Sequence, residues 1–161
     1  MKFELIDQVL QATDEKLVAV KTVTAAEEYL ADHFPSFPVL PGVLMLEAAA
    51  QAATFLLHRR TDFARAVAVI REARNIRYGH FVAPGQTLTV TAEFLKQTDA
   101  GASFKVAGEV AGTQAFAGRL ELAYFDLAQK NLADSSTDEA LKAHARRRWA
   151  RLGRDFAAAS L

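Results

Sequence analysis

The sequence has no cysteine among its 161 residues, so disulfide bonds and thiolate zinc sites are excluded. This absence fits a reducing compartment. Lys and Arg together number 19, as do Asp and Glu, so the formal net charge is zero and does not favour binding to nucleic acid or to an acidic surface. The N-terminus lacks the charged lead, apolar core and small-residue cleavage site of a secretion signal. We therefore expect a cytoplasmic protein that binds neither nucleic acid nor membrane.

Several motifs with well-defined chemistry are also missing. The chain has no G-x-G-x-x-G, no Walker A sequence, no G-x-S-x-G and no H-E-x-x-H. His58, His80 and His144 have no metal-ligand spacing with carboxylates, so we expect no metal site. We interpret His80 as a surface or edge residue, and a place in the lining of a pocket is the less favoured alternative. Tyr78 and Phe81 could line a tunnel, but core packing is the favoured interpretation.

The segment 33–57, HFPSFPVLPGVLMLEAAAQAATFLL, differs from the rest of the chain. Residues 39–57 include one charged residue, Glu47, and are rich in Leu, Met and Ala, which predicts a helix buried on all sides. The run is too short and too interrupted to span a bilayer, which takes roughly 20 apolar residues. Pro41 suits the first turn of this helix, and Gly42 is small enough to let another group approach the backbone.

The polar residues of this helix form one stripe, because Glu47, Gln51 and Thr54 follow the i, i+4, i+7 spacing. A carboxylate buried in apolar surroundings is unfavourable unless it is paired or protonated. No Lys or Arg lies within one turn of Glu47. The stripe has two interpretations: Glu47 hydrogen-bonds a structural partner elsewhere, or it is functional.

His33 lies upstream of the helix, just before Pro35, Pro38 and Pro41. Prolines at this spacing exclude a regular helix and disfavour a central strand, so they predict a stiff extended loop. A lone histidine is more often structural than catalytic. A histidine on a rigid loop, a glutamate on an apolar helix and a helix N-terminus together form a candidate site.

The remaining pattern is mostly that of strands. Residues 1–10 fit either a short strand or a helical turn, and 17–24 predict a strand followed by a helical turn at 25–31. After the helix, turn signals separate strands predicted at 66–70, 73–82, 86–98, 102–112 and 114–127. One long helix followed by four or five strands predicts an α+β fold, with an antiparallel sheet wrapped around the helix.

The C-terminal residues look like an appendage, so we divide the chain into a domain at 1–128 and a helical extension at 129–161. Ser136 with Glu139 fits a capping box. We interpret the segment as an amphipathic helix packed on the domain or on a neighbouring subunit. The alternative is a basic docking surface for an acidic carrier protein, while nucleic acid is less favoured. The apolar face consists of Leu141, Ala145, Trp149, Leu152 and Phe156.

The stretch HFPSFPVLPGVLMLEAAAQA closely resembles the signature of the β-hydroxyacyl-acyl-carrier-protein dehydratases, which have the hotdog fold. The likeness covers roughly residues 4–125. It includes LIDQVLQATDEKLVAVKTVTAAEEYLADHFP and FVAPGQTLTVTAEFL, which resemble the first strands and the strand entry after the central helix. The motif is specific, because histidine, prolines, glycine, glutamate and glutamine all fall in register.

The resemblance implies a long helix wrapped by an antiparallel sheet, in dimers whose sheets join and which often assemble as trimers of dimers. It places the active site at the dimer interface, where His33 of one chain meets Glu47 of the other. Gly42 would present its backbone N–H to the thioester carbonyl, and Gln51 would orient Glu47.

The activity implied is dehydration of (3R)-3-hydroxyacyl thioesters to trans-2-enoyl thioesters in fatty-acid or related lipid biosynthesis. The substrate would be carried on the phosphopantetheine of acyl carrier protein, and no separate cofactor is expected. His33 would act as base and Glu47 as acid. Two rival functions stay open on the same fold: an acyl-thioesterase, and a non-catalytic subunit that binds acyl carrier protein.

Overall fold

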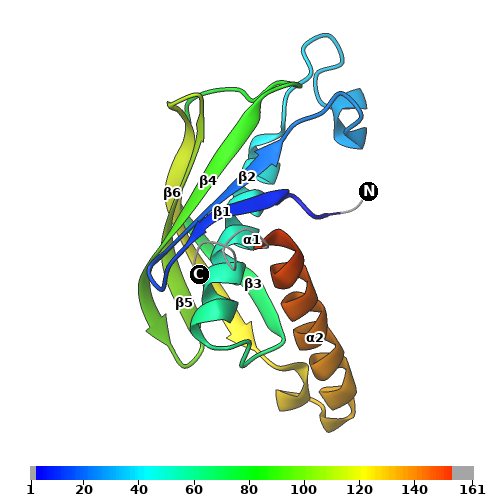
Figure 1. The fold of residues 1–161 in the computed structure, drawn as a ribbon, viewed down its shortest axis with the longest axis vertical. Helices are drawn as coiled ribbons and strands as arrows, with labels where there is room; N and C mark the ends of the chain where they lie inside the picture. Colours follow the sequence, from blue (N-terminus) through cyan, green and yellow to red (C-terminus); the bar gives the residue numbers. More distant parts are fainter. Residues whose placement is uncertain (1–2, 154–161) are drawn as a thin grey trace, which may run out of the picture.

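The apolar segment forms α1 (Gly42–Arg60), a helix enclosed on one side by a curved antiparallel sheet (Figure 1). This arrangement comes from a computed structural model that describes residues 3–153. The sheet has six strands in the order β1-β2-β4-β5-β6-β3, and each neighbouring pair is antiparallel. The strands are β1 (Gln8–Ala12), β2 (Lys16–Thr22), β3 (Val67–Tyr78), β4 (Thr87–Thr98), β5 (Gly101–Val110) and β6 (Thr113–Phe125). The α+β prediction is confirmed.

Alternation along the strands buries one face of the sheet against α1, as the period of two requires. The helix meets this face through alanines, since Ala48, Ala49, Ala52 and Ala53 have no exposed surface. Small side chains let the sheet approach closely, and the larger residues of β4 and β5 fill the space around them. The buried positions of these two strands include Leu88, Val90, Ala92, Phe104 and Val106.

Two expectations about the sheet and the helix are corrected. The strands predicted at 66–70 and 73–82 form one continuous strand, β3. Two register shifts interrupt its alternation, and for this reason the sequence pattern suggested two strands. One of these shifts holds Asn75 at a φ of 55°. The helix α1 is also not buried on all sides in the single chain: Val43 is 71% exposed, and Glu47 and Thr54 are partly exposed. The open stripe of α1 is therefore the one that carries its polar residues.

Short 3-10 turns connect the main elements. The helical turn predicted at 25–31 is η1 (Glu28–Ala31), which leads into the proline loop. After β6, η2 (Leu127–Gln129) and η3 (Leu132–Asp134) lead into the second long helix, α2 (Ser135–Leu152). None of the helices in the part of the chain that the structure describes could cross a membrane.

The helix α2 lies on the side of α1 away from the sheet (Figure 1). It starts at Ser135 without a side-chain cap hydrogen bond, so the predicted capping box is not formed. Instead, the buried carboxylate of Asp138 accepts hydrogen bonds from the backbone N–H groups of Leu127 and Ala128, each at 2.9 Å. This anchors the helix start to the segment after β6.

The apolar face of α2 packs on its own chain. The Trp149 ring lies 6.1 Å from the Phe55 ring, and Leu152 is 6% exposed. Leu141 stays 37% exposed, and Phe156 lies outside the described residues. Packing on the domain is thus confirmed for the described part of the helix. The division of the chain at residue 128 stays a prediction.

Candidate active site

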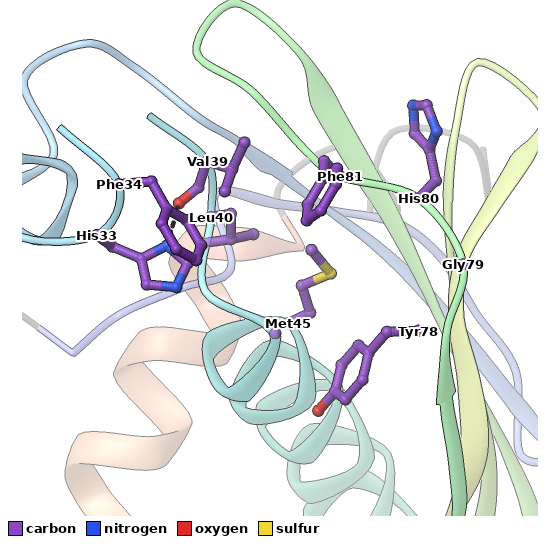
Figure 2. A pocket seen from close by; sticks show the side chains of 10 residues that line it. His33, Phe34, Val39, Leu40, Met45, Tyr78, Gly79, His80 and Phe81 are labelled. Carbon is purple, nitrogen blue, oxygen red and sulfur yellow. Dashed lines mark hydrogen bonds between the residues drawn. The ribbon is translucent and has the colours of Figure 1, made fainter. Parts of the chain in front are cut away.

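The proline loop holds His33 through its own backbone. The His33 N–H donates to the Tyr29 carbonyl at 3.0 Å, and its ring nitrogen Nδ1 lies 3.0 Å from the Val39 carbonyl oxygen. A carbonyl oxygen only accepts, so Nδ1 carries the hydrogen. In the neutral imidazole the lone pair is then on Nε2, which is the atom that could act as a general base. In Figure 2 this nitrogen lies on the side of the ring that faces Met45.

The loop is also locally constrained. Phe34 has a φ of 55°, which is uncommon for a residue with a side chain. Its ring lies 4.4 Å from the His33 ring. The loop ends at Leu40, whose N–H donates to the Val82 carbonyl at 2.8 Å. This hydrogen bond links the loop to the segment after β3. The imidazole therefore has few alternative positions.

The start of α1 lies beside the loop. Gly42 is its first residue, and no acidic side chain occupies the first turn. The first N–H groups of a helix have no partner within the helix, and they lie at the positive end of its dipole. A Cβ at Gly42 would lie 3.0 Å from Cε1 of Tyr78, so glycine lets the Tyr78 ring cover the helix start. This end of α1 suits an oxygen that gains negative charge.

A pocket of about 340 Å³ brings these groups together (Figure 2). It is lined by His33, Gly42, Met45, Tyr78 and Phe81, among others. We call it the histidine pocket. Partial burial raises the pKa of the Tyr78 hydroxyl above its ordinary value, so this group stays protonated near neutral pH.

Glu47 and Gln51 form a second cluster one turn apart on α1. The Gln51 side-chain amide donates to Glu47 Oε1 at 2.9 Å and to the Phe3 carbonyl at 2.8 Å. Its oxygen accepts from the Leu5 N–H at 3.0 Å. Gln51 is therefore pinned to the N-terminal segment and holds the Glu47 carboxyl in one orientation. The expected hydrogen bond between Glu47 and Gln51 is present, while their catalytic roles stay predictions.

Glu47 lines a separate hollow of about 330 Å³, which we call the glutamate groove. Gln51, Thr54 and His58 of α1 line it too, together with residues of β3 and α2. His33 belongs to the histidine pocket and Glu47 to the glutamate groove, so a single chain does not bring the two into one hollow. Among the described residues, no group of His, Cys, Asp and Glu side chains could hold a metal ion.

Comparison with known proteins places this chain in a family. The sequence model of the FabA-like domain matches residues 1–118. The chain belongs to the FabA-like family.

Individual members of the family are similar over most of the chain. The 3-hydroxyacyl-[acyl-carrier-protein] dehydratase FabZ of Streptococcus equi subsp. zooepidemicus (strain MGCS10565) is 35% identical over 120 residues, which are 74% of this chain and 86% of the relative. FabZ of Lactococcus lactis subsp. cremoris (strain SK11) is 36% identical over 121 residues, 75% of this chain and 84% of the relative.

Solved structures show the same fold. The dehydratase heterocomplex ApeI:P from Xenorhabdus doucetiae matches with a TM-score of 0.66 and 20% identity, over 83% of this chain and 90% of that chain. The PaaI protein of Escherichia coli, from the phenylacetic acid degradation operon, matches with a TM-score of 0.58 and 18% identity, over 72% and 81%. These likenesses confirm the hotdog fold predicted from the sequence.

Two aromatic residues of this FabA-like chain were misplaced by sequence reasoning. Tyr78 and Phe81 were favoured as core residues, yet they are 50% and 61% exposed and line the histidine pocket. The only signal available was their position at and just after the end of the irregular strand β3, where alternation gives no inward direction. His80 is exposed, as expected, and it also contributes to the lining of the histidine pocket, although its ring points away from the other labelled side chains in Figure 2.

A second group of residues was missed because it comes from α2. Leu141, His144, Ala145 and Arg148 line the glutamate groove beside Glu47. The FabA-like match ends at residue 118, so this wall lies outside it. The helical spacing predicted the helix, but no local signal connected it to Glu47.

Proposed function

We propose that this chain dehydrates (3R)-3-hydroxyacyl thioesters on acyl carrier protein to trans-2-enoyl thioesters in fatty-acid or related lipid biosynthesis. The observation that carries the proposal is the placement of His33: its Nδ1–H donates to the Val39 carbonyl, so that in the neutral ring Nε2 is the basic atom, in a pocket that also contains the amino end of α1. The identity to FabZ dehydratases over some 120 residues supports it independently.

The reaction uses three groups of the protein. His33 Nε2 removes the proton from the carbon next to the thioester carbonyl, and the negative charge that develops on the carbonyl oxygen is stabilised by the Gly42 N–H and the helix dipole. These electrons form the carbon–carbon double bond as the bond to the 3-hydroxyl breaks. The Glu47 carboxyl gives its proton to the departing hydroxyl, so water leaves. Transfer of the proton from His33 back to Glu47 restores the starting state.

Each group is worth a measurable part of the rate. General acid and general base each contribute on the order of 10² to 10⁴, and one hydrogen-bond donor to the oxyanion on the order of 10² to 10³. No step needs a redox group or a metal ion. The acyl group would arrive on the phosphopantetheine of acyl carrier protein, which is the partner we propose.

The separation of His33 and Glu47 into different hollows supports a homodimer in which one chain supplies each group. The strand β3 is an edge of the sheet, so its outer backbone groups are free to pair with a second copy. Val69 and Ile70 on this strand are 47% and 38% exposed, and Val43 of α1 is 71% exposed. We propose that two copies join along β3 and complete two active sites. Further assembly as a trimer of dimers is part of the same proposal.

The test compares two products from one substrate. The purified protein is incubated with 3-hydroxyacyl-acyl carrier protein, and the enoyl thioester is followed by absorbance while free thiol is followed by a colour reaction. Enoyl formation without thiol release supports the dehydratase. Thiol release without enoyl formation would replace it with the thioesterase, and binding of the carrier with neither product would leave a non-catalytic subunit.

A further inference from the structure

The glutamate groove runs along α1, and α2 forms one of its walls. On α1 the lining residues extend from Glu47 to His58, over which the helix rises roughly 16 Å. The opposite wall comes from β3 and includes Ala68 and Ile70. Leu141 and Ala145 of α2 line the groove as well. The groove therefore follows about three turns of α1, with the proposed catalytic carboxyl near one end.

The α2 wall is fixed along its whole length. At its start the Asp138 carboxylate is held by two backbone N–H groups, and in its middle Arg146 donates to Asp62 Oδ1 at 2.8 Å. At its end the Trp149 ring packs against Phe55, and the Arg148 guanidinium lies 5.1 Å from the centre of that same ring. Arg151 also donates to Glu4 at 2.7 Å. A wall tied down at three places sets the width of the groove.

Part of the surface of the groove suits hydrocarbon. Small or apolar side chains from α1, β3, β6 and α2, and one residue just before β3, line this part: Ala50, Ala66, Ala68, Ile70, Leu122 and Leu141. Polar side chains line another part: Glu47, Gln51, Thr54, His58, His144 and Arg148. A dry engineered cavity of roughly 150 Å³ binds benzene, and the groove has about 330 Å³. On that scale it holds on the order of ten carbon atoms.

We infer that α2 sets the length of the acyl chain that this protein accepts, with Ala145 as the residue that keeps the groove open and Leu141 as its far wall. The inference rests on the proposed function, because the reaction at Glu47 directs the rest of the acyl chain along α1. The occupant is a saturated acyl chain of medium length. Each methylene that the groove buries raises kcat/KM about fourfold, and methylenes beyond its end add nothing.

The experiment measures kcat/KM for substrates of different acyl chain length in the wild type and in a matched pair of variants. Ala145→Phe fills the groove, and Ala150→Phe makes the same change at an exposed position of α2 outside it. Substrates are 3-hydroxybutanoyl, 3-hydroxydecanoyl and 3-hydroxytetradecanoyl thioesters on acyl carrier protein. Wild type and Ala150→Phe prefer the decanoyl substrate. Ala145→Phe loses roughly tenfold or more on the decanoyl substrate and keeps its rate on the butanoyl one.

A second readout separates this inference from the proposed function. Calorimetry measures binding of decanoyl- and butanoyl-pantetheine, with no turnover required. Weaker decanoyl binding by Ala145→Phe alone supports the groove even if the wild type forms no enoyl product. The same chain-length profile in all three proteins overturns the inference. An equal loss on every substrate, together with a smaller assembly by size-exclusion chromatography, also overturns it, because a second copy of the chain then occupies the groove.

Discussion

The loop that carries His33 and the helical turn that carries Glu47 are built by different means. His33 is positioned by groups within six residues of it, through its bonds to the Tyr29 and Val39 carbonyls. Glu47 is positioned by Gln51, which is itself held by Phe3 and by the Leu5 N–H, more than 40 residues away in the chain. One half-site is therefore local and the other depends on the tertiary fold. This difference predicts that the two halves respond differently to mutation.

The largest effects are expected from the two proposed catalytic residues themselves. His33→Ala and Glu47→Gln each lower kcat by on the order of 10² to 10⁴ without changing the unfolding temperature, because each removes a proton-transfer group and neither is a core residue. Enoyl absorbance measures the rate, and circular dichroism measures the fold. Near wild-type turnover in either variant would contradict the assignment.

Mixing the two variants tests whether the halves come from different chains. After dissociation and random reassembly, half of the dimers are mixed, and each mixed dimer holds one intact site, so about a quarter of the wild-type activity returns. Each variant reassembled with itself serves as the control. If mixed dimers form and stay inactive, His33 and Glu47 do not act across the interface.

The next effect concerns the histidine of the glutamate groove, in contrast to His33 of the histidine pocket. Burial, and secondarily the Arg146 charge, lowers the pKa of His58 from 6.5 to about 4. The unfolded chain thus binds this proton more readily than the folded one, so the stabilisation from neutral His58 is full above pH 6.5 and is lost as the pH falls toward 4. The loss amounts to about 3 kcal/mol at most.

Urea unfolding between pH 7 and pH 4 measures this loss. His58→Gln keeps an acceptor for the Tyr124 hydroxyl, which lies 3.2 Å from His58 Nδ1, but does not titrate. The stability of this variant depends less steeply on pH than that of the wild type. Parallel pH profiles for the two proteins would show that His58 is not the group responsible.

A smaller effect is expected where the glutamate half-site depends on the N-terminal segment. Gln51→Leu leaves the Leu5 N–H and the Phe3 carbonyl without their partner, which costs about 1–3 kcal/mol of unfolding free energy. It also frees the Glu47 carboxyl and lowers kcat by roughly tenfold. Thr54→Val, on the same stripe of α1, is the matched control and leaves both values unchanged. Unaltered kcat in Gln51→Leu would show that Glu47 needs no orientation.

The smallest effect is expected at the start of α1. Gly42→Ala adds a methyl group 3.0 Å from Cε1 of Tyr78, so this half-exposed ring must shift. Stability changes by less than about 1 kcal/mol because the ring can move, while kcat/KM falls several-fold because the oxygen site is displaced. The double variant Gly42→Ala with Tyr78→Ala removes the clash. An unchanged kcat/KM in Gly42→Ala would show that displacement of the Tyr78 ring does not affect the proposed oxygen site.

Much of the fold could be read from periodicity. The alanine- and leucine-rich run predicted α1, and alternation predicted β4, β5 and β6 to within two residues at each end. β3 was divided in two because its register shifts break the alternation that identifies a strand. The exposure of Glu47 was misjudged because composition reports how apolar a helix is and not which of its faces the sheet covers.

The sequence by itself determined the local half of the candidate site: three prolines fix the loop, and the residues next to His33 supply its hydrogen-bond partners. Only the tertiary structure decided that Gln51 reaches the N-terminal segment, that Tyr78 covers Gly42, and that α2 forms a wall beside Glu47. The physical reason is range. Backbone preferences and side-chain periodicity act over a few residues, whereas these three contacts join segments more than 30 residues apart and exist only once the sheet has closed around α1.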